Sequence, residues 1–238
     1  MRAFSALQAG NLVRFEALLR ANPRLANERG TNGNSLLNLA VSLAAKSDWK
    51  SGLSLIEALL AAGADVSDAN DRGWTPLHAA AYSNNPHIAD MLIAKGAALD
   101  AEAHGAGGTP LIVTLFWGHR EVAELLGRHS LSPGNLRVAA GLGIPELVEA
   151  CFSSRTSLTP EACAARGFYR PHSGFPDWHP STEQQEVLDE VLVWACKSNR
   201  VVVLERLVQA GARLDADPYR GTPLIWVGYA TAKRRPNG

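Results

Sequence analysis

The chain has 238 residues, of which 46% are hydrophobic and 19% charged, and its 23 Lys and Arg residues balance 23 Asp and Glu. This balance argues against broad electrostatic binding to nucleic acid or to an acidic membrane. No apolar run approaches the roughly 18 residues that a membrane-spanning helix needs, and the N-terminal segment lacks the pattern of a secretory signal. With three widely spaced cysteines, the composition predicts a soluble, cytoplasmic protein with reduced thiols.

Two short phrases recur along the chain. The first reads GNSLLNLAV at 33–41, GWTPLHAAA at 73–81, GTPLIVTLF at 108–116 and GTPLIWVGY at 221–229. The second follows it, as IEALLAAGADV at 56–66, ADMLIAKGAAL at 89–99 and LERLVQAGARL at 204–214. Thr75 and Thr109 are 34 residues apart, a period typical of repeat proteins whose helical pairs bury their apolar flanks only by stacking.

The residues of one repeat predict where its helices begin and end. Thr75 can accept backbone N–H bonds as an N-cap, and Pro76 at the first helical position has no N–H to leave unsatisfied. Leu77 and Leu92 lie on apolar helical faces, and Gly96 stands where a left-handed residue ends the second helix.

These residues resemble the ankyrin repeat family, whose pattern runs G-x-TPLH-x-AA-x-x-GH-x-x-V-x-x-LL-x-x-GA. The match is closest at 71–103, continues at 104–131 and extends in looser form to nearly the whole chain. The resemblance implies an all-α ankyrin-repeat solenoid of stacked helical hairpins that forms a single domain over 1–238. The spacing of the leucines predicts about six helical pairs and a C-terminal half-repeat at 219–232, with no finger between the repeats at 104–131 and 134–158.

An insertion at 159–185 interrupts the repeats in the position of one finger. Its prolines and glycines prevent a long helix, yet Phe168, Tyr169, Phe175 and Trp178 are too many aromatics for a solvated linker. One interpretation is that these aromatics pack on the stack. The other is that Tyr169 and Trp178 form a partner-binding tip, since both residue types are favoured in binding hot spots.

The sequence offers no catalytic motif, so we expect neither an enzyme nor a cofactor. Cys151 and Cys196 fall on apolar helix positions, whereas Cys163 is expected to be accessible. A metal or small-molecule site in the insertion at 163–179 remains an alternative hypothesis, because that segment also holds His172, Asp177 and His179.

The family resemblance places the recognition surface on the finger tips and the exposed positions of the first helices. We therefore predict that an unidentified protein or peptide partner binds in the concave groove of the repeats and contacts the inserted loop. The predicted contact residues are Asp71, Arg72, Trp74, Tyr82, Phe116, Trp117, Tyr169, Trp178 and Tyr229. Three of them, Tyr82, Phe116 and Tyr229, stand seven residues after a repeat threonine and are expected to form an aromatic stripe, unless they pack inward. We expect a monomer that binds neither nucleic acid nor membrane, with self-association through the C-terminal half-repeat as an alternative.

Overall fold

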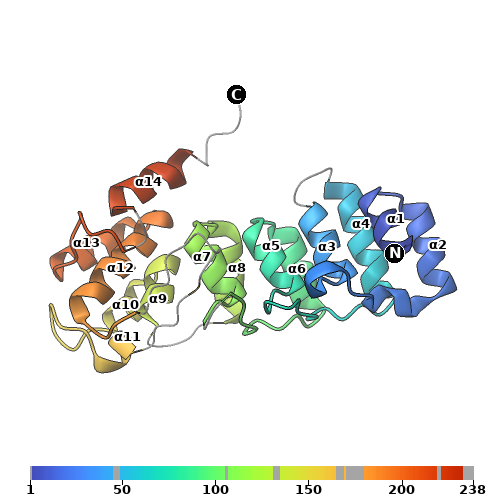
Figure 1. Cartoon of the computed structure of the whole chain (residues 1–238). Coiled ribbons are helices and arrows are strands. Elements are labelled where there is room, and N and C mark those ends of the chain that lie inside the picture. Colours follow the sequence, from blue (N-terminus) through green and yellow to red (C-terminus); the bar gives the residue numbers. More distant parts are fainter. Residues whose placement is uncertain are drawn as a thin grey trace. The chain divides into compact units, whose positions relative to one another are not determined.

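The computed structural model describes residues 2–44, 49–104, 107–130, 135–164, 169, 180–218 and 221–232. The chain forms two compact units, residues 1–104 (unit 1) and 105–238 (unit 2). Within the described ranges, both units consist of helices joined by turns and loops, with two isolated antiparallel bridges and no extended sheet. This confirms the all-α architecture that the repeated phrases predict; Figure 1 shows the helices in chain order from blue to red.

The described residues of unit 1 form three successive helical hairpins. Its helices are α1 (Arg2–Gln8), α2 (Leu12–Ala21), α3 (Leu36–Ala44), α4 (Trp49–Ala61), α5 (Pro76–Tyr82) and α6 (Pro86–Ala94). Two short 3-10 segments, η1 (Pro23–Asn27) and η2 (Thr31–Gly33), lie between α2 and α3. The first helices stack, since α3 contacts both α1 and α5. Leu37, Ile56, Leu77 and Leu92 are fully buried in this core, and each contributes roughly 1.5–3 kcal/mol by leaving water.

Helix α5 begins as its sequence predicts. The hydroxyl of Thr75 accepts the backbone N–H of His78, and the His78 ring nitrogen accepts the backbone N–H of Thr75 at 3.2 Å. Gly73, just before this cap, has a φ of 78°, and a Cβ there would stand 2.2 Å from the carbonyl oxygen of Glu102. Only glycine therefore allows the two finger segments to approach this closely.

Unit 2 continues the same plan with an insertion. Its helices are α7 (Pro110–Trp117), α8 (Arg120–His129), α9 (Leu136–Leu142), α10 (Pro145–Glu149), α11 (Pro160–Ala164), α12 (Gln184–Lys197), α13 (Val201–Gln209) and α14 (Pro223–Ala232). Its core brings together α9, α10, α12 and α13 through buried residues such as Leu136, Val148, Val191 and Leu207.

The described residues confirm the predicted repeat count. The pairs are α1–α2, α3–α4, α5–α6, α7–α8, α9–α10 and α12–α13, and α14 is the first helix of the half-repeat. Between α8, which ends at His129, and α9, which begins at Leu136, the chain is too short for a finger, as the spacing predicts. The insertion contributes α11, whose Ala162 is buried in the core of unit 2.

Candidate functional site

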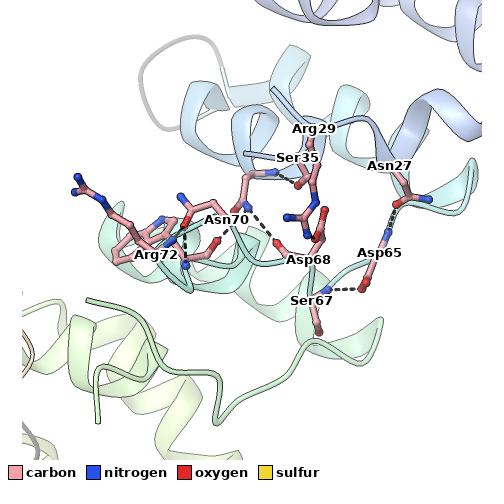
Figure 2. A network of polar contacts seen from close by, with 10 residues as sticks. Asn27, Arg29, Ser35, Asp65, Ser67, Asp68, Asn70 and Arg72 are labelled. Atoms are coloured by element: carbon pink, nitrogen blue, oxygen red, sulfur yellow. Dashed lines mark hydrogen bonds and ion pairs between the residues drawn. The ribbon is translucent and has the colours of Figure 1, made fainter. Parts of the chain in front are cut away.

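The finger that precedes α5 is closed by the side chain of Asn70. The Asn70 Oδ1 accepts the backbone N–H groups of Arg72 and Trp74 at 2.9 and 3.0 Å, and the backbone N–H of Asn70 donates to the Trp74 carbonyl at 3.0 Å. Figure 2 shows these bonds beside the labelled Asn70 and Arg72. A finger of five residues, 70–74, is thus fixed by its own hydrogen bonds, which hold its tip in one conformation.

Neighbouring loops of unit 1 brace this finger from one side. Asn70 Nδ2 donates to Asn34 Oδ1 at 2.9 Å, and the backbone N–H of Asp71 donates to the Asn32 carbonyl at 3.2 Å. Next to this contact, Arg29 forms an ion pair with Asp68. Hydrogen bonds and an ion pair therefore join the two loops along one edge of unit 1.

Asn38, buried on α3, connects the helices to this edge. Its Nδ2 donates to the carbonyl oxygens of Asp68 and Trp74 at 3.0 and 3.1 Å. In the repeated phrase Asn38 stands where the next repeat has His78, and Ser35 stands where that repeat has Thr75. Sequence reasoning did not single out Asn38, although aligning GNSLLNLAV with GWTPLHAAA places it at this connecting position.

A second set of bonds joins the ends of the loops. The backbone N–H of Asp65 donates to Asn27 Oδ1 at 2.8 Å, and Asn27 Nδ2 donates to the Gly63 carbonyl at 2.9 Å. Ser67 then accepts the backbone N–H of Ala98 at 2.9 Å, so three repeats are connected in series. Asn27, Asp65 and Ser67 lie along this path in Figure 2.

Four of the predicted contact residues lie together at this edge. Asp71 and Arg72 are exposed at the finger tip, Trp74 is half-buried, and Tyr82, at the end of α5, is 51% exposed. The Trp74 and Tyr82 rings meet edge to face with centroids 6.1 Å apart. Trp74 thus links the finger to the exposed aromatic ring on the helix.

His104 completes the aromatic group. Its ring lies edge to face against Trp74 with centroids 5.1 Å apart, and its backbone N–H donates to the Arg72 carbonyl at 3.3 Å. Two causes lower the pKa of His104 from its ordinary value of 6.5. The larger is partial burial, and the smaller is the nearby Arg72 guanidinium. The imidazole is therefore predominantly neutral near pH 7, and it adds aromatic surface without adding charge.

The predicted contact residues of unit 2 occupy different environments. Phe116 and Tyr169 are only 1% and 3% exposed, so the expectation that they form a binding surface is wrong for both side chains. Their rings meet edge to face with centroids 5.3 Å apart. Tyr169 follows the other interpretation of the insertion, in which its aromatics pack on the stack. Trp117 is half-buried and also contacts Phe116.

Buried ionisable side chains lie near Phe116. Lys197 Nζ lies 3.8 Å from the centroids of both the Phe116 and Trp226 rings. Burial lowers the pKa of Lys197 well below its ordinary value, and Glu190 opposes that shift. Glu190 Oε1 in turn accepts a hydrogen bond from buried Arg137 at 3.1 Å. At this position, unit 2 presents a filled interior rather than an open groove.

The remaining predicted positions fall outside the described part of the structure. Trp178 and the side chain of Tyr229 are among them, as are the candidate metal ligands His172, Asp177 and His179. The described residues contain no group of three or more His, Cys, Asp or Glu placed to hold a metal ion.

The burial of the three cysteines of unit 2 agrees with their positions in the sequence. Cys151 and Cys196 are buried, and burial raises the pKa of both thiols, that of Cys196 to about 11. Cys163 is partly exposed. Since a thiol with a raised pKa is protonated near pH 7, neither Cys151 nor Cys196 is suited to act as a nucleophile.

Comparisons with known proteins agree with this architecture. The family model for ankyrin repeats (3 copies) matches residues 41–134. The human ASB11 ankyrin repeat domain, a crystal structure, superimposes with a TM-score of 0.54 at 21% identity, covering 100% of this chain and 99% of that one.

Two curated relatives share sequence with the chain. The ankyrin repeat domain-containing protein SAT10 of Stachybotrys chartarum is 27% identical over 221 residues, which is 90% of this chain and 10% of that protein. The RelA-associated inhibitor of Mus musculus is 40% identical over 57 residues, or 24% of this chain and 7% of that protein. The chain thus spans a tenth or less of the length of these relatives.

Across the described ranges, no helix has the length and apolar character needed to cross a membrane.

Proposed function

We propose that the chain is a cytoplasmic protein-binding adaptor rather than an enzyme, because residues 41–134 match the family model for ankyrin repeats and the fold resembles that of an ankyrin repeat domain. The proposed contact surface is the finger at 70–74 together with Tyr82. Proteins of this fold are typically interaction scaffolds, but a fold does not by itself fix a function. The proposal therefore rests on the surface of unit 1.

The observation that carries the proposal is the exposed ring of Tyr82 beside a braced finger. An exposed tyrosine offers a large contact area and loses little conformational entropy when it binds. The bonds that Asn70 makes to Arg72 and Trp74 already order the finger, so a partner does not have to order it on binding. Asp71 and Arg72 supply polar groups at the rim of this surface.

Site-specific photo-crosslinking tests the proposal. A p-benzoyl-phenylalanine residue at position 82 preserves an aromatic ring at the proposed centre, and the same residue at position 202 is the matched control. Val202 is also exposed, but it lies on α13 of unit 2. We expect position 82 to form a discrete adduct in native lysate that excess wild-type protein prevents. The proposal is wrong if position 82 gives no adduct, or only the adducts that position 202 gives.

A second candidate function, self-association through the half-repeat, has one observation in its favour. Leu224 and Ile225 on α14 are 78% and 61% exposed, whereas Leu111 and Ile112, at the same positions of α7, are 4% and 6% exposed. Helix α7 contacts α8, α9 and α12, and its leucine and isoleucine at these positions are buried. Light scattering of wild type against a Leu224→Gln/Ile225→Gln variant separates the cases, since only self-association predicts a mass that falls in the variant.

A further inference from the structure

Carboxylates outnumber cations along the loops of unit 1. The finger edge, defined as residues 28–34, 65–74 and 98–104, contains six acidic residues and two arginines. The acids are Glu28, Asp65, Asp68, Asp71, Asp100 and Glu102, and the arginines are Arg29 and Arg72. The whole chain, by contrast, carries 23 residues of each sign. The charge of this edge is therefore a local feature.

Hydrogen bonds hold the three segments of the finger edge side by side. The N–H of Asp71 donates to the Asn32 carbonyl, and the N–H of His104 donates to the Arg72 carbonyl. Arg29 is engaged by Asp68. The exposed charged residues of the edge are four acids, Asp65, Asp71, Asp100 and Glu102, and two bases, Arg72 and the paired Arg29.

A partly exposed aromatic ring, of the kind that cations favour, lies beside the finger edge. Tyr82 is half exposed beside Trp74, and a Lys or Arg side chain over such a ring gains about 0.5–1 kcal/mol at an exposed site. Carboxylates nearby attract the same cation over about 10 Å at moderate salt. Aromatic surface and negative charge thus select the same type of ligand.

We propose that the finger edge of unit 1 binds a basic peptide segment, with one Lys or Arg side chain on Tyr82 and its other cations along Asp71 and Glu102. This inference rests on the proposed protein-binding function and names the chemistry of the partner. Arg72 opposes such a ligand, so two neighbouring residues, Asp71 and Arg72, affect binding in opposite directions.

Fluorescence anisotropy with two synthetic peptides tests the proposal on the full chain. The probe is a fluorescein-labelled peptide of alternating lysine and glycine with a central leucine, and its matched control has glutamate in place of each lysine. We expect the lysine peptide to bind and to weaken steeply with added salt, and the glutamate peptide not to bind. Tyr82→Ala should weaken the lysine peptide by roughly 2- to 5-fold, the equivalent of one exposed cation–π contact.

Charge variants test whether the lysine peptide binds at the finger edge. Asp71→Asn/Glu102→Gln should weaken the lysine peptide by about tenfold at low salt, and Arg72→Gln should strengthen it. The control variant, Glu121→Gln/Glu146→Gln, removes the same charge from exposed positions of unit 2 and should leave binding unchanged. Equal weakening by both double variants, or equal binding of both peptides, would overturn the proposal. A specific adduct at position 82 without binding of the lysine peptide would refute only the basic-peptide inference and leave the proposed function intact.

Discussion

Tyr82 of unit 1 and Phe116 of unit 2 occupy the same position, seven residues after a repeat threonine, yet one ring is 51% exposed and the other 1%. In unit 2, Phe116 is covered by side chains from distant segments, Tyr169 of the insertion and Lys197 at the end of α12. Whether a repeat position is available for binding therefore depends on what the rest of the chain places over it.

The two units also differ in how polar groups connect their repeats. Unit 1 connects them at the loops, through partly solvated bonds of Asn27, Asn38 and Asn70. Unit 2 places charges inside, where Arg137 and Glu190 are almost completely buried. Solvated bonds of this kind contribute about 1 kcal/mol each, whereas a buried charge that loses its partner costs several. Substitutions in the two units should therefore differ in their effects on stability.

The largest expected difference is between Phe116→Ala and Tyr82→Ala. Truncation of buried Phe116 removes its packing with Tyr169 and Trp194 and leaves a cavity, so we expect a loss of about 3–5 kcal/mol in the free energy of unfolding. Truncation of half-exposed Tyr82 should cost less than about 1 kcal/mol. Urea unfolding followed by circular dichroism measures both, and hydrogen exchange should localise the loss to α7 and α12. Similar losses in the two variants would contradict the difference in burial.

The buried ion pair gives the next largest effect. Glu190→Gln leaves Arg137 and Lys197 without a neighbouring carboxylate in a buried site, so we expect a loss of about 3 kcal/mol. The control is the double variant Arg137→Met/Glu190→Leu, which replaces the pair by apolar side chains and should lose much less. If the double variant were as unstable as the single one, the cost would arise from packing or from Lys197, which loses Glu190 in both variants, rather than from Arg137.

The repeat pattern predicted the helices well because their signals are local. The cap formed by Thr75, the proline after it and the spacing of the leucines act within one or two turns, so they appear directly in the sequence. The same locality explains the correct prediction of six pairs, a half-repeat and a missing finger.

The sequence predicted only part of the candidate site because burial is not a local property. Phe116 appeared equivalent to Tyr82 until the structure placed Tyr169 and Lys197 against it. The role of Asn38 was missed for a related reason. Its two acceptors, the carbonyls of Asp68 and Trp74, are 30 and 36 residues away along the chain, and no short motif records such a contact.

Asn38→Ala tests whether the loops of unit 1 depend on this single side chain. The substitution removes the Asn38 amide donor from both carbonyls in a partly buried place, and only the Trp74 carbonyl keeps a second donor, the Asn70 N–H, so we expect a loss of about 1–2 kcal/mol. Asn22→Ala is the control, because Asn22 is exposed and makes no side-chain cap bond, and it should change stability by less than about 0.5 kcal/mol. Hydrogen exchange at residues 70–74 should accelerate in the first variant only; unchanged exchange there would show that the finger is held by its own bonds alone.

The smallest expected effect is a pH dependence of stability that arises from His104 in unit 1. Because burial and Arg72 lower the pKa of His104 in the folded chain, the unfolded chain binds its proton more readily. Stability should therefore fall as pH decreases below about 6.5 and stop changing, for this group, once the pH is below the folded pKa. His104→Asn should flatten that part of the profile, and asparagine tolerates the left-handed φ of 56° at this position. Arg72→Gln should bring the pKa of His104 closer to 6.5, as an NMR titration of the imidazole would show. A folded-state pKa at or above 6.5 in wild type would mean that the ring is more solvated, or more favourably placed for a positive charge, than its contacts with Trp74 and Arg72 imply.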